Sequence, residues 1–323
     1  MTLPETTIEK ELRTTESEQL DPLGSAANRR RTFRPRVRRF PWHRLVFIVP
    51  AFVIYTTFMV YPLLDSLRLS MFSDAGNFVG LDNFRTLFGD STYSHAFWNA
   101  LKHNVVFFLF HSLVQNPIAL LLALLLTVQG VRGQAVYRTL IFVPTVLSVV
   151  VIGFIWSHIL SPLWGIVDTP YLGQSSTALP TLSLMSVWQW VGIPMIFFYA
   201  VLIAIPHDII EAAKVDGAGA LRVFRSVTLP LILPMLGVIT IVTFIANFNA
   251  FDLIYTVQGA LAGPEFSSDI LGTFFYRTAF GFQLQSGSDA MGATVATAMF
   301  LIILFGVLVY MFGWARRVQT YEM

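Results

Sequence analysis

Residues 211–230, EAAKVDGAGALRVFRSVTLP, form a charged insert between two apolar runs that are each long enough to cross a bilayer. Strong helix formers over residues 209–215 predict a short helix, which ends at Asp216-Gly217 because glycine readily takes the left-handed conformation that stops a helix. Residues 218–227 predict a second short helix, and Pro230 marks the start of the next span. The pattern predicts a helix–turn–helix element on a membrane surface. An ordinary amphipathic loop has the same spacing, so spacing alone leaves both interpretations open.

The composition indicates a polytopic membrane protein. Of the 323 residues, 55% are hydrophobic and only 12% are charged, about half the charged share of a typical soluble domain. Six stretches contain no Asp, Glu, Lys or Arg and have the length that a membrane helix needs. They are residues 45–64, 104–128, 140–160, 181–205, 229–251 and 291–314. We therefore expect an all-α fold with six transmembrane helices.

The basic residues predict the orientation of these spans. Both tails and the loops at 129–139 and 206–228 carry 17 of the 21 Lys and Arg residues. The other four, on the opposite side, are Arg68, Arg85, Lys102 and Arg277. Because cytoplasmic loops carry the excess of Lys and Arg, both termini and the charged insert are expected in the cytoplasm.

The chain divides by composition into four expected parts. Residues 1–40 form a disordered cytoplasmic tail, acidic and then arginine-rich, without a cleavable signal peptide. The arginine run at 29–44 fits the cytoplasmic flank of a membrane helix better than a nucleic-acid patch. Residues 41–96 form the first transmembrane helix and an outer loop, 97–315 the transmembrane core and 316–323 a cytoplasmic tail. The long outer loops at 65–103 and 252–290 suit two roles, the docking of an external partner protein or simple connection of the membrane helices.

The insert resembles the EAA loop of ATP-binding-cassette (ABC) importer permeases. The residues that carry the resemblance are Glu211, Ala212, Ala213, Asp216, Gly217, Leu229 and Pro230. Val227 is a mild departure from the family's isoleucine. The resemblance implies the type I importer permease fold, in which this loop is the coupling helix that sits in a cleft of the cytoplasmic ATPase subunit.

The resemblance extends over residues 97–314 and is closest to the carbohydrate-importer branch. It is carried by LIAIPHDIIEAAKVDGAG (202–219), FIANFNAFDLIYTV (244–257) and FFYRTAF (274–280). The stretch QGALAGPEF (258–266) departs from the Gly-Gly-Pro that the family often has there. The shape of that outer turn, which bears on docking of a binding protein, is therefore left open.

Two sets of residues share helical faces in the predicted spans and form a candidate substrate pathway. They are Trp188, Gly192, Met195 and Tyr199 in the fourth span, and Thr240, Thr243 and Asn247 in the fifth. Polar groups inside a membrane are costly unless they are paired or line a wet cavity. Aromatic faces beside hydroxyl and amide groups suit a sugar. Resemblance to the maltose-type subunit also aligns Gly192, Thr243 and Asn247 with its sugar site.

Other roles remain open for several of these side chains. Trp188 and Trp190 also fit an aromatic belt at the outer membrane surface. The Thr240 hydroxyl is expected to bond its own helix backbone. Asn249 points to the face opposite Asn247 and is expected to tie helices together. His111 and His158, in apolar surroundings, are expected to be packed, hydrogen-bonded histidines rather than metal ligands or proton carriers.

The energy source is expected on other chains. The sequence has no G-x-x-x-x-G-K-[ST] loop to hold ATP, no carboxylate within a span to relay protons and no cysteine. No catalytic constellation or metal site is predicted, and no cofactor is expected on this chain.

The resemblance implies a set of partners in the cell membrane. These are a second homologous permease, two ATPase subunits carrying ATP and Mg, an extracytoplasmic solute-binding protein, a carbohydrate substrate and membrane lipids, with no nucleic acid. The alternatives are the same machine carrying glycerol phosphate or another polyol and, more distantly, a stand-alone secondary carrier.

Overall fold

The computed structural model describes residues 42–128, 132–283 and 285–315. The chain divides into two units, Met1–Tyr55 and Thr56–Met323, each of which is described by itself. The described part of the first unit is helix α2, Trp42–Tyr55. Its side chains from Phe47 to Tyr55 are all exposed. The predicted tails at 1–40 and 316–323 lie outside the described residues.

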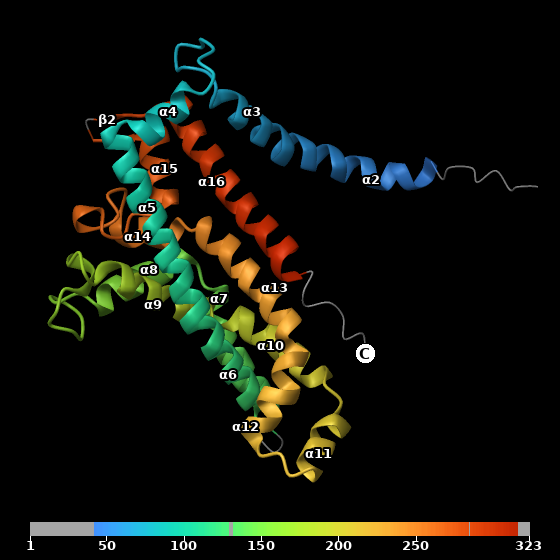
Figure 1. Cartoon of the computed structure of the whole chain (residues 1–323). Helices are drawn as coiled ribbons and strands as arrows, with labels where there is room; N and C mark the ends of the chain where they lie inside the picture. Colours follow the sequence, from blue (N-terminus) through green and yellow to red (C-terminus); the bar gives the residue numbers. More distant parts are fainter. Residues whose placement is uncertain (1–41, 129–131, 284, 316–323) are drawn as a thin grey trace, which may run out of the picture. The chain divides into compact units, whose positions relative to one another are not determined.

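The second unit is built almost entirely of helices (Figure 1). Its first half contains η1 (Thr56–Val60), α3 (Tyr61–Leu69), α4 (Asp82–Gly89), α5 (Ser91–Phe110), η2 (His111–Gln115), α6 (Asn116–Thr127), α7 (Gln134–Val146), α8 (Val149–Ile159), η3 (Tyr171–Gly173), α9 (Ala178–Trp190) and α10 (Gly192–Ala204). Its second half contains α11 (His207–Val215), α12 (Ala220–Val223), η4 (Phe224–Thr228), α13 (Leu229–Phe248), α14 (Asp252–Gln258), η5 (Pro264–Phe266), α15 (Leu271–Phe280), α16 (Asp289–Val309) and η6 (Tyr310–Ala315). A two-residue antiparallel hairpin, β1 (Gly281–Phe282) with β2 (Gln285–Ser286), joins α15 to α16; Gly281 pairs with Ser286.

Four helical stretches of the described chain are long and apolar enough to cross a membrane. They are Phe47–Leu69, Ser91–Thr127, Ala220–Phe248 and Asp289–Trp314. Two further candidates are bent pairs: α7 with α8, bent by 95°, and α9 with α10, bent by 46°. The described residues therefore give six spans if each bent pair crosses once. The spans predicted at 140–160 and 181–205 fall on these two bent pairs, so each is broken along its length.

Both breaks have local causes. In α7, Pro144 has no N–H to donate, and the next junction is extended, with ψ of 146° at Leu147 and 133° at Ser148. In α10, Pro194 leaves the carbonyl of Trp190 without its usual helical donor. The Thr145 hydroxyl donates to the carbonyl of Gln189 at 2.9 Å, so a side chain of α7 supports the end of α9.

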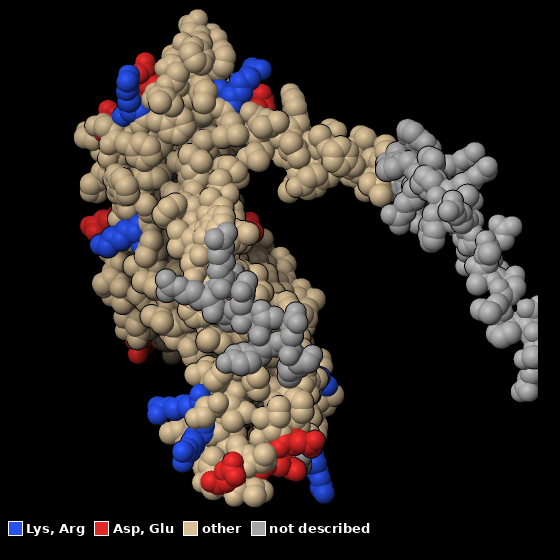
Figure 2. Space-filling model, turned by 45° about the vertical axis from the view of Figure 1, so that its right-hand side comes forward, with Lys and Arg blue, Asp and Glu red and all other residues tan. Residues whose placement is uncertain are grey.

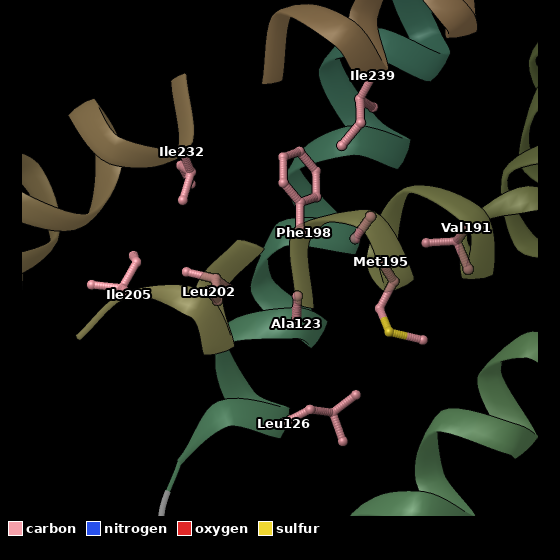
Figure 3. Packing of buried hydrophobic residues seen from close by; sticks show 10 residues of the cluster. Ala123, Leu126, Val191, Met195, Phe198, Leu202, Ile205, Ile232 and Ile239 are labelled. Carbon is pink, nitrogen blue, oxygen red and sulfur yellow. The ribbon is translucent and has the colours of Figure 1, made fainter. Parts of the chain in front are cut away.

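Three helices meet in a close-packed core around Phe198 (Figure 3). Ala119 and Ala123 on α6 are fully buried, and their small side chains let α10 approach closely with Met195 and Phe198. Ile232 and Ile239 extend the same cluster onto α13. The core thus holds α13 against α6 and α10.

Helix α16 packs against α15 through a glycine. A Cβ added at Gly292 would lie 2.6 Å from the Cβ and 2.9 Å from the Cα of Ala279, so the backbone of α15 would have to move. Overpacking of this kind typically costs about 1–3 kcal/mol.

We expect Gly292→Ala to lower the free energy of unfolding by about that amount, read from thermal unfolding in detergent. Gly313→Ala, on the same stretch of helix but with open space around it, is the matched control and should leave the midpoint within about 1 °C of wild type. Equal midpoints for the two variants would show that α15 is not held this closely.

The connection between α13 and α16 contains a buried ion pair that the sequence did not indicate. The guanidinium of Arg277 donates to both carboxylate oxygens of Asp269, at 2.9 and 2.7 Å, and to the carbonyl of Ala260 at 2.8 Å. Thr273 donates to the same carboxylate at 2.6 Å, and a His103 ring nitrogen lies 2.8 Å from the Asp269 carbonyl. Arg277, one of the four basic residues predicted on the outer side, is thus buried in a hydrogen-bonded network; its side of the membrane stays a prediction.

Candidate functional site

The charged insert forms a turn whose geometry requires glycine. The N–H of Gly217 donates to the carbonyl of Lys214, and the N–H of Ala218 donates to that of Ala213, both at 3.0 Å. This pair of bonds is a Schellman motif that closes the end of α11. Gly217 has φ +81°, and no atom lies within 4 Å of the place where a Cβ would be. Backbone conformation, not lack of space, therefore requires glycine here.

The turn presents a mixed surface to its surroundings. Glu211, Ala212, Lys214 and Asp216 are exposed or partly exposed, and Val215 is 87% exposed. Figure 2 shows acidic and basic side chains gathered at the lower end of the second unit, where Figure 1 places α11 and α12. An exposed apolar side chain ringed by charges of both signs is suited to contact with another protein.

The inner side of α11 is attached to the membrane core. Ile210 packs against the cluster formed by α6, α10 and α13, and Ile205 belongs to it. The second helix of the insert differs from the expectation, because α12, η4 and α13 run on as one span from Ala220. Pro230 has no N–H to donate and follows the π turn η4, where the normal bonding pattern is already changed. Leu229 and Pro230 thus lie inside this span rather than at its start.

A cavity of about 360 Å³ lies between α5–η2, α9–α10 and α13–α14. This volume is in the range of small-molecule sites. Its described lining is mostly apolar and aromatic, with a few polar groups: His111, Gln115, Ser186, Thr243, Asn247, Asn249 and Asp252. Among these described lining residues the only charged side chain is that of Asp252.

The polar groups of the cavity are held in defined orientations. Asn247 donates its Nδ2 to the carbonyl of Thr243 at 2.7 Å, which turns its Oδ1 away from the helix backbone. His111 uses Nδ1 on the carbonyl of Phe107 at 2.8 Å, and its Nε2 lies 2.9 Å from the Ser186 hydroxyl. The expectation that His111 is a packed, hydrogen-bonded histidine is confirmed, and the cavity adds that its ring lines an open space.

The candidate pathway residues divide into two groups. Thr243 and Asn247 line the cavity, whereas Trp188, Gly192, Met195 and Tyr199 do not. The bend between α9 and α10 separates Trp188 from the other three and breaks the single helical face on which they were placed. Their assignment to a pathway stays a prediction.

These four residues make protein contacts instead. Met195 is fully buried in the helical core, and Tyr199 lies under the Arg138 guanidinium, 4.8 Å from ring centre to Cζ. Gly192 packs against the backbone of α7, where a Cβ added to it would lie 3.0 Å from the carbonyl oxygen of Ile141. Trp188 packs edge-on against Trp156.

The remaining pathway candidate, Thr240, and two residues near the pathway also have defined hydrogen bonds or positions. Thr240 donates to the carbonyl of Leu236 at 2.7 Å, which confirms that its hydroxyl bonds its own helix. Asn249 was expected to tie helices together, but its amide donates to the carbonyl of Ile245 in its own helix, and it lines the cavity. Trp190 also lines the cavity.

The described residues offer no metal centre. No group of three or more His, Asp or Glu side chains in the described ranges is arranged to hold a metal ion. His158 lies near the surface of the described chain, with Nδ1 2.9 Å from the carbonyl of Phe154.

Comparison with known proteins assigns the family. Residues 115–317 match the family described as binding-protein-dependent transport system inner membrane component. The lactose transport system permease protein LacF of Rhizobium radiobacter is 31% identical over 287 residues, covering 84% of this chain and 93% of that protein. The diacetylchitobiose uptake system permease protein NgcF of Streptomyces coelicolor is 30% identical over 326 residues, covering 90% of each chain. The sn-glycerol-3-phosphate transport system permease protein UgpA of Escherichia coli is 31% identical over 287 residues, covering 84% of this chain and 94% of that protein.

The fold has a counterpart among solved structures. A chain of a bacterial alginate ABC transporter, crystallised with an alginate pentasaccharide-bound periplasmic protein, superposes with a TM-score of 0.74 at 20% identity, covering 86% of this chain and 96% of that one. The chain therefore belongs to the family of inner membrane components of binding-protein-dependent transport systems. It is a permease subunit of an ABC importer, a transporter component and not an enzyme.

Proposed function

We propose that this permease carries a sugar or oligosaccharide and that the turn at Gly217 couples its cavity to ATP hydrolysis on partner subunits. The carbohydrate cargo is supported by relatives named for lactose and diacetylchitobiose uptake and by a cavity that combines aromatic walls with amide and hydroxyl groups. Sugars have apolar C–H faces and many hydroxyl groups, so this lining matches them.

The coupling role rests on the two faces of α11, one exposed to a partner and the other packed on the membrane core. Glu211 and Val215 face outward, while Ile210 packs on the core that includes α10 and α13. Both of these helices line the cavity, and α13 carries Thr243 and Asn247. An ATPase subunit that displaces α11 would therefore shift the cavity wall through close-packed side chains, which transmit displacement rather than absorb it.

The remaining partners complete the transporter in the inner membrane. A separate binding protein delivers the sugar to the outer face, a second homologous permease forms the other half of the pathway, and two cytoplasmic ATPase subunits bind ATP and Mg. Both termini and α11 lie in the cytoplasm, as the distribution of Lys and Arg predicts. Purification of the chain from its native membrane tests this composition, because a stand-alone carrier would arrive without an ATPase and still move solute in liposomes.

Asn247→Leu is expected to lower sugar uptake by about tenfold, because it removes a buried amide from the cavity wall and costs roughly one hydrogen bond to the cargo. Uptake is measured in proteoliposomes with the whole complex, whose assembly is checked by co-purification. Thr240→Val is the matched control on the same helix, since that hydroxyl is used within the helix. Normal uptake by Asn247→Leu would remove this residue from the pathway.

A further inference from the structure

Two buried amide side chains of the cavity have hydrogen-bonding capacity left over. Gln115 and Asn247 are each 5% exposed, yet Gln115 Oε1 and Asn247 Oδ1 have no hydrogen-bond partner among the described residues. Both residues line the cavity, one from η2 and the other from α13. A buried polar oxygen without a partner costs about 1–3 kcal/mol, so its presence in a cavity wall calls for a bound donor.

The orientation of Asn247 follows from its neighbours. Its Nδ2 donates to the Thr243 carbonyl, which can only accept, so the free atom is the acceptor Oδ1. The adjoining stretch of α13 is also fixed, because Asn104 donates its Nδ2 to the carbonyl of Asn247 at 2.8 Å. A ligand that pairs with this oxygen must therefore offer a donor.

The His111–Ser186 pair leads to the same requirement. The Phe107 carbonyl can only accept, so His111 Nδ1 carries a proton, and in the neutral ring Nε2 accepts the Ser186 hydroxyl hydrogen. The Ser186 oxygen then has only lone pairs to offer to the cavity. Three elements thus carry acceptor oxygens in the cavity wall: η2 on Gln115, α9 on Ser186 and α13 on Asn247.

The backbone of η2 supports a site here. His111 and Gln115 lie at the two ends of a single π turn within the helix Ser91–Thr127, and both line the cavity. π turns are rare and occur frequently at functional sites. Polar side chains inside a membrane span are costly, so their concentration on this turn indicates a role beyond packing.

We propose that the η2 wall is a substrate-binding surface selective for neutral, hydroxyl-rich ligands, with Gln115 as its specificity-determining residue. This inference rests on the proposed function and deepens it by naming a residue that selects among cargo molecules. Hydroxyl groups donate to the acceptors of Gln115, Ser186 and Asn247. An ionised phosphate or carboxylate group has no hydrogen to donate to these oxygens, finds no Lys or Arg among the described lining residues and is repelled by Asp252.

The placement of Gln115 is tested without knowledge of the cargo. Because the chain contains no cysteine, Gln115→Cys supplies its only thiol, and labelling can be read on the band of this chain. In the assembled complex a small water-soluble thiol reagent should label Gln115→Cys at least tenfold faster than Leu113→Cys, a position that is 70% exposed on the outer surface of the same helix. Equal rates at the two positions would overturn the proposed site.

Selectivity is tested in proteoliposomes that hold the whole transporter and its binding protein. The probes are lactose, maltose, cellobiose and diacetylchitobiose as neutral ligands, with sn-glycerol 3-phosphate and galacturonate as anions. We expect a neutral sugar to be taken up fastest. Gln115→Met, which keeps the shape but not the polarity, should lower its uptake about tenfold, and Gln115→Glu, which keeps the acceptors, should restore it to within about threefold.

The outcomes separate the inference from the proposed function. Uptake of a neutral sugar that is unchanged in Gln115→Met, relative to the exposed control Leu113→Met, overturns the role of Gln115 and leaves the importer intact. Faster uptake of galacturonate overturns the selectivity for neutral ligands alone, whereas faster uptake of sn-glycerol 3-phosphate overturns the proposed carbohydrate cargo as well. If ATP is hydrolysed but none of the probes is transported, the proposed carbohydrate cargo fails together with the inference.

Discussion

Replacement of Asp269 by alanine is expected to lower the free energy of unfolding by about 3–5 kcal/mol, because it leaves the guanidinium of Arg277 buried without its counter-charge. The Asp269 side chain is 1% exposed and that of Arg277 is 10% exposed. The same substitution also removes the acceptor of Thr273. The loss is measured as a fall in the thermal midpoint of the purified chain and in the amount of folded protein recovered from membranes.

The chain contains a suitable control for this prediction. Arg85 and Asp82 form an ion pair of the same 2.7 Å length, but their side chains are 80% and 62% exposed. Asp82→Ala should therefore cost less than about 1 kcal/mol. The double variant Asp269→Leu with Arg277→Met should recover part of the loss, since it removes both buried charges. Equal losses of unfolding free energy in Asp269→Ala and Asp82→Ala would show that the buried ion pair does not stabilise the fold.

Gly217→Val should uncouple the transporter, lowering the solute carried per ATP hydrolysed by more than about tenfold. A β-branched residue at φ +81° is strained by about 1–2 kcal/mol, and relief of that strain breaks the two bonds that close α11. The outward face of α11, with Glu211 and Val215, then loses its fixed direction. Transport and ATP hydrolysis are measured together in proteoliposomes.

Gly219→Val is the matched control for the turn. Gly219 lies two residues further on, has φ −70° and has open space around it, so valine fits there without strain. The solute carried per ATP hydrolysed by Gly219→Val should stay within about twofold of wild type. If Gly217→Val transports as well as Gly219→Val, the coupling role assigned to the turn is contradicted. Loss of the whole complex from the membrane in Gly217→Val alone would mean that the turn serves assembly instead.

Much of the fold is readable from local sequence. The absence of charge over about 20 residues predicts a membrane helix wherever it occurs, because burial in lipid depends on the composition of the segment itself. The requirement for glycine at position 217 can also be read locally, since the left-handed conformation at the end of α11 depends on one residue and its neighbours. The family resemblance at residues 211–230 rests on this same stretch, which explains why the importer class follows from sequence.

The cavity could be predicted only in part. Asn247 and Thr243 were found from their spacing on one helix, and both line the cavity. The set placed across the fourth span does not share a single helical face, because α9 and α10 are bent by 46° beside Pro194. The hydrogen bond from Thr145 on α7 that supports the end of α9 joins two separate segments and could not be read from the span itself. His111 and Gln115 stand out in the sequence as polar residues within an apolar span. That they line a cavity depends on the packing of α9, which carries Ser186, and of α13.

The sequence by itself thus determined the apolar spans, the glycine turn and the class of transporter, because each depends on residues adjacent in the chain. Only the tertiary structure decided that Arg277 is buried against Asp269 and that Gln115 and Asn247 line one cavity. These features join residues that are distant in the chain. A charge or an amide is stable in such surroundings only when a partner from elsewhere in the fold, or a ligand, completes its hydrogen bonds.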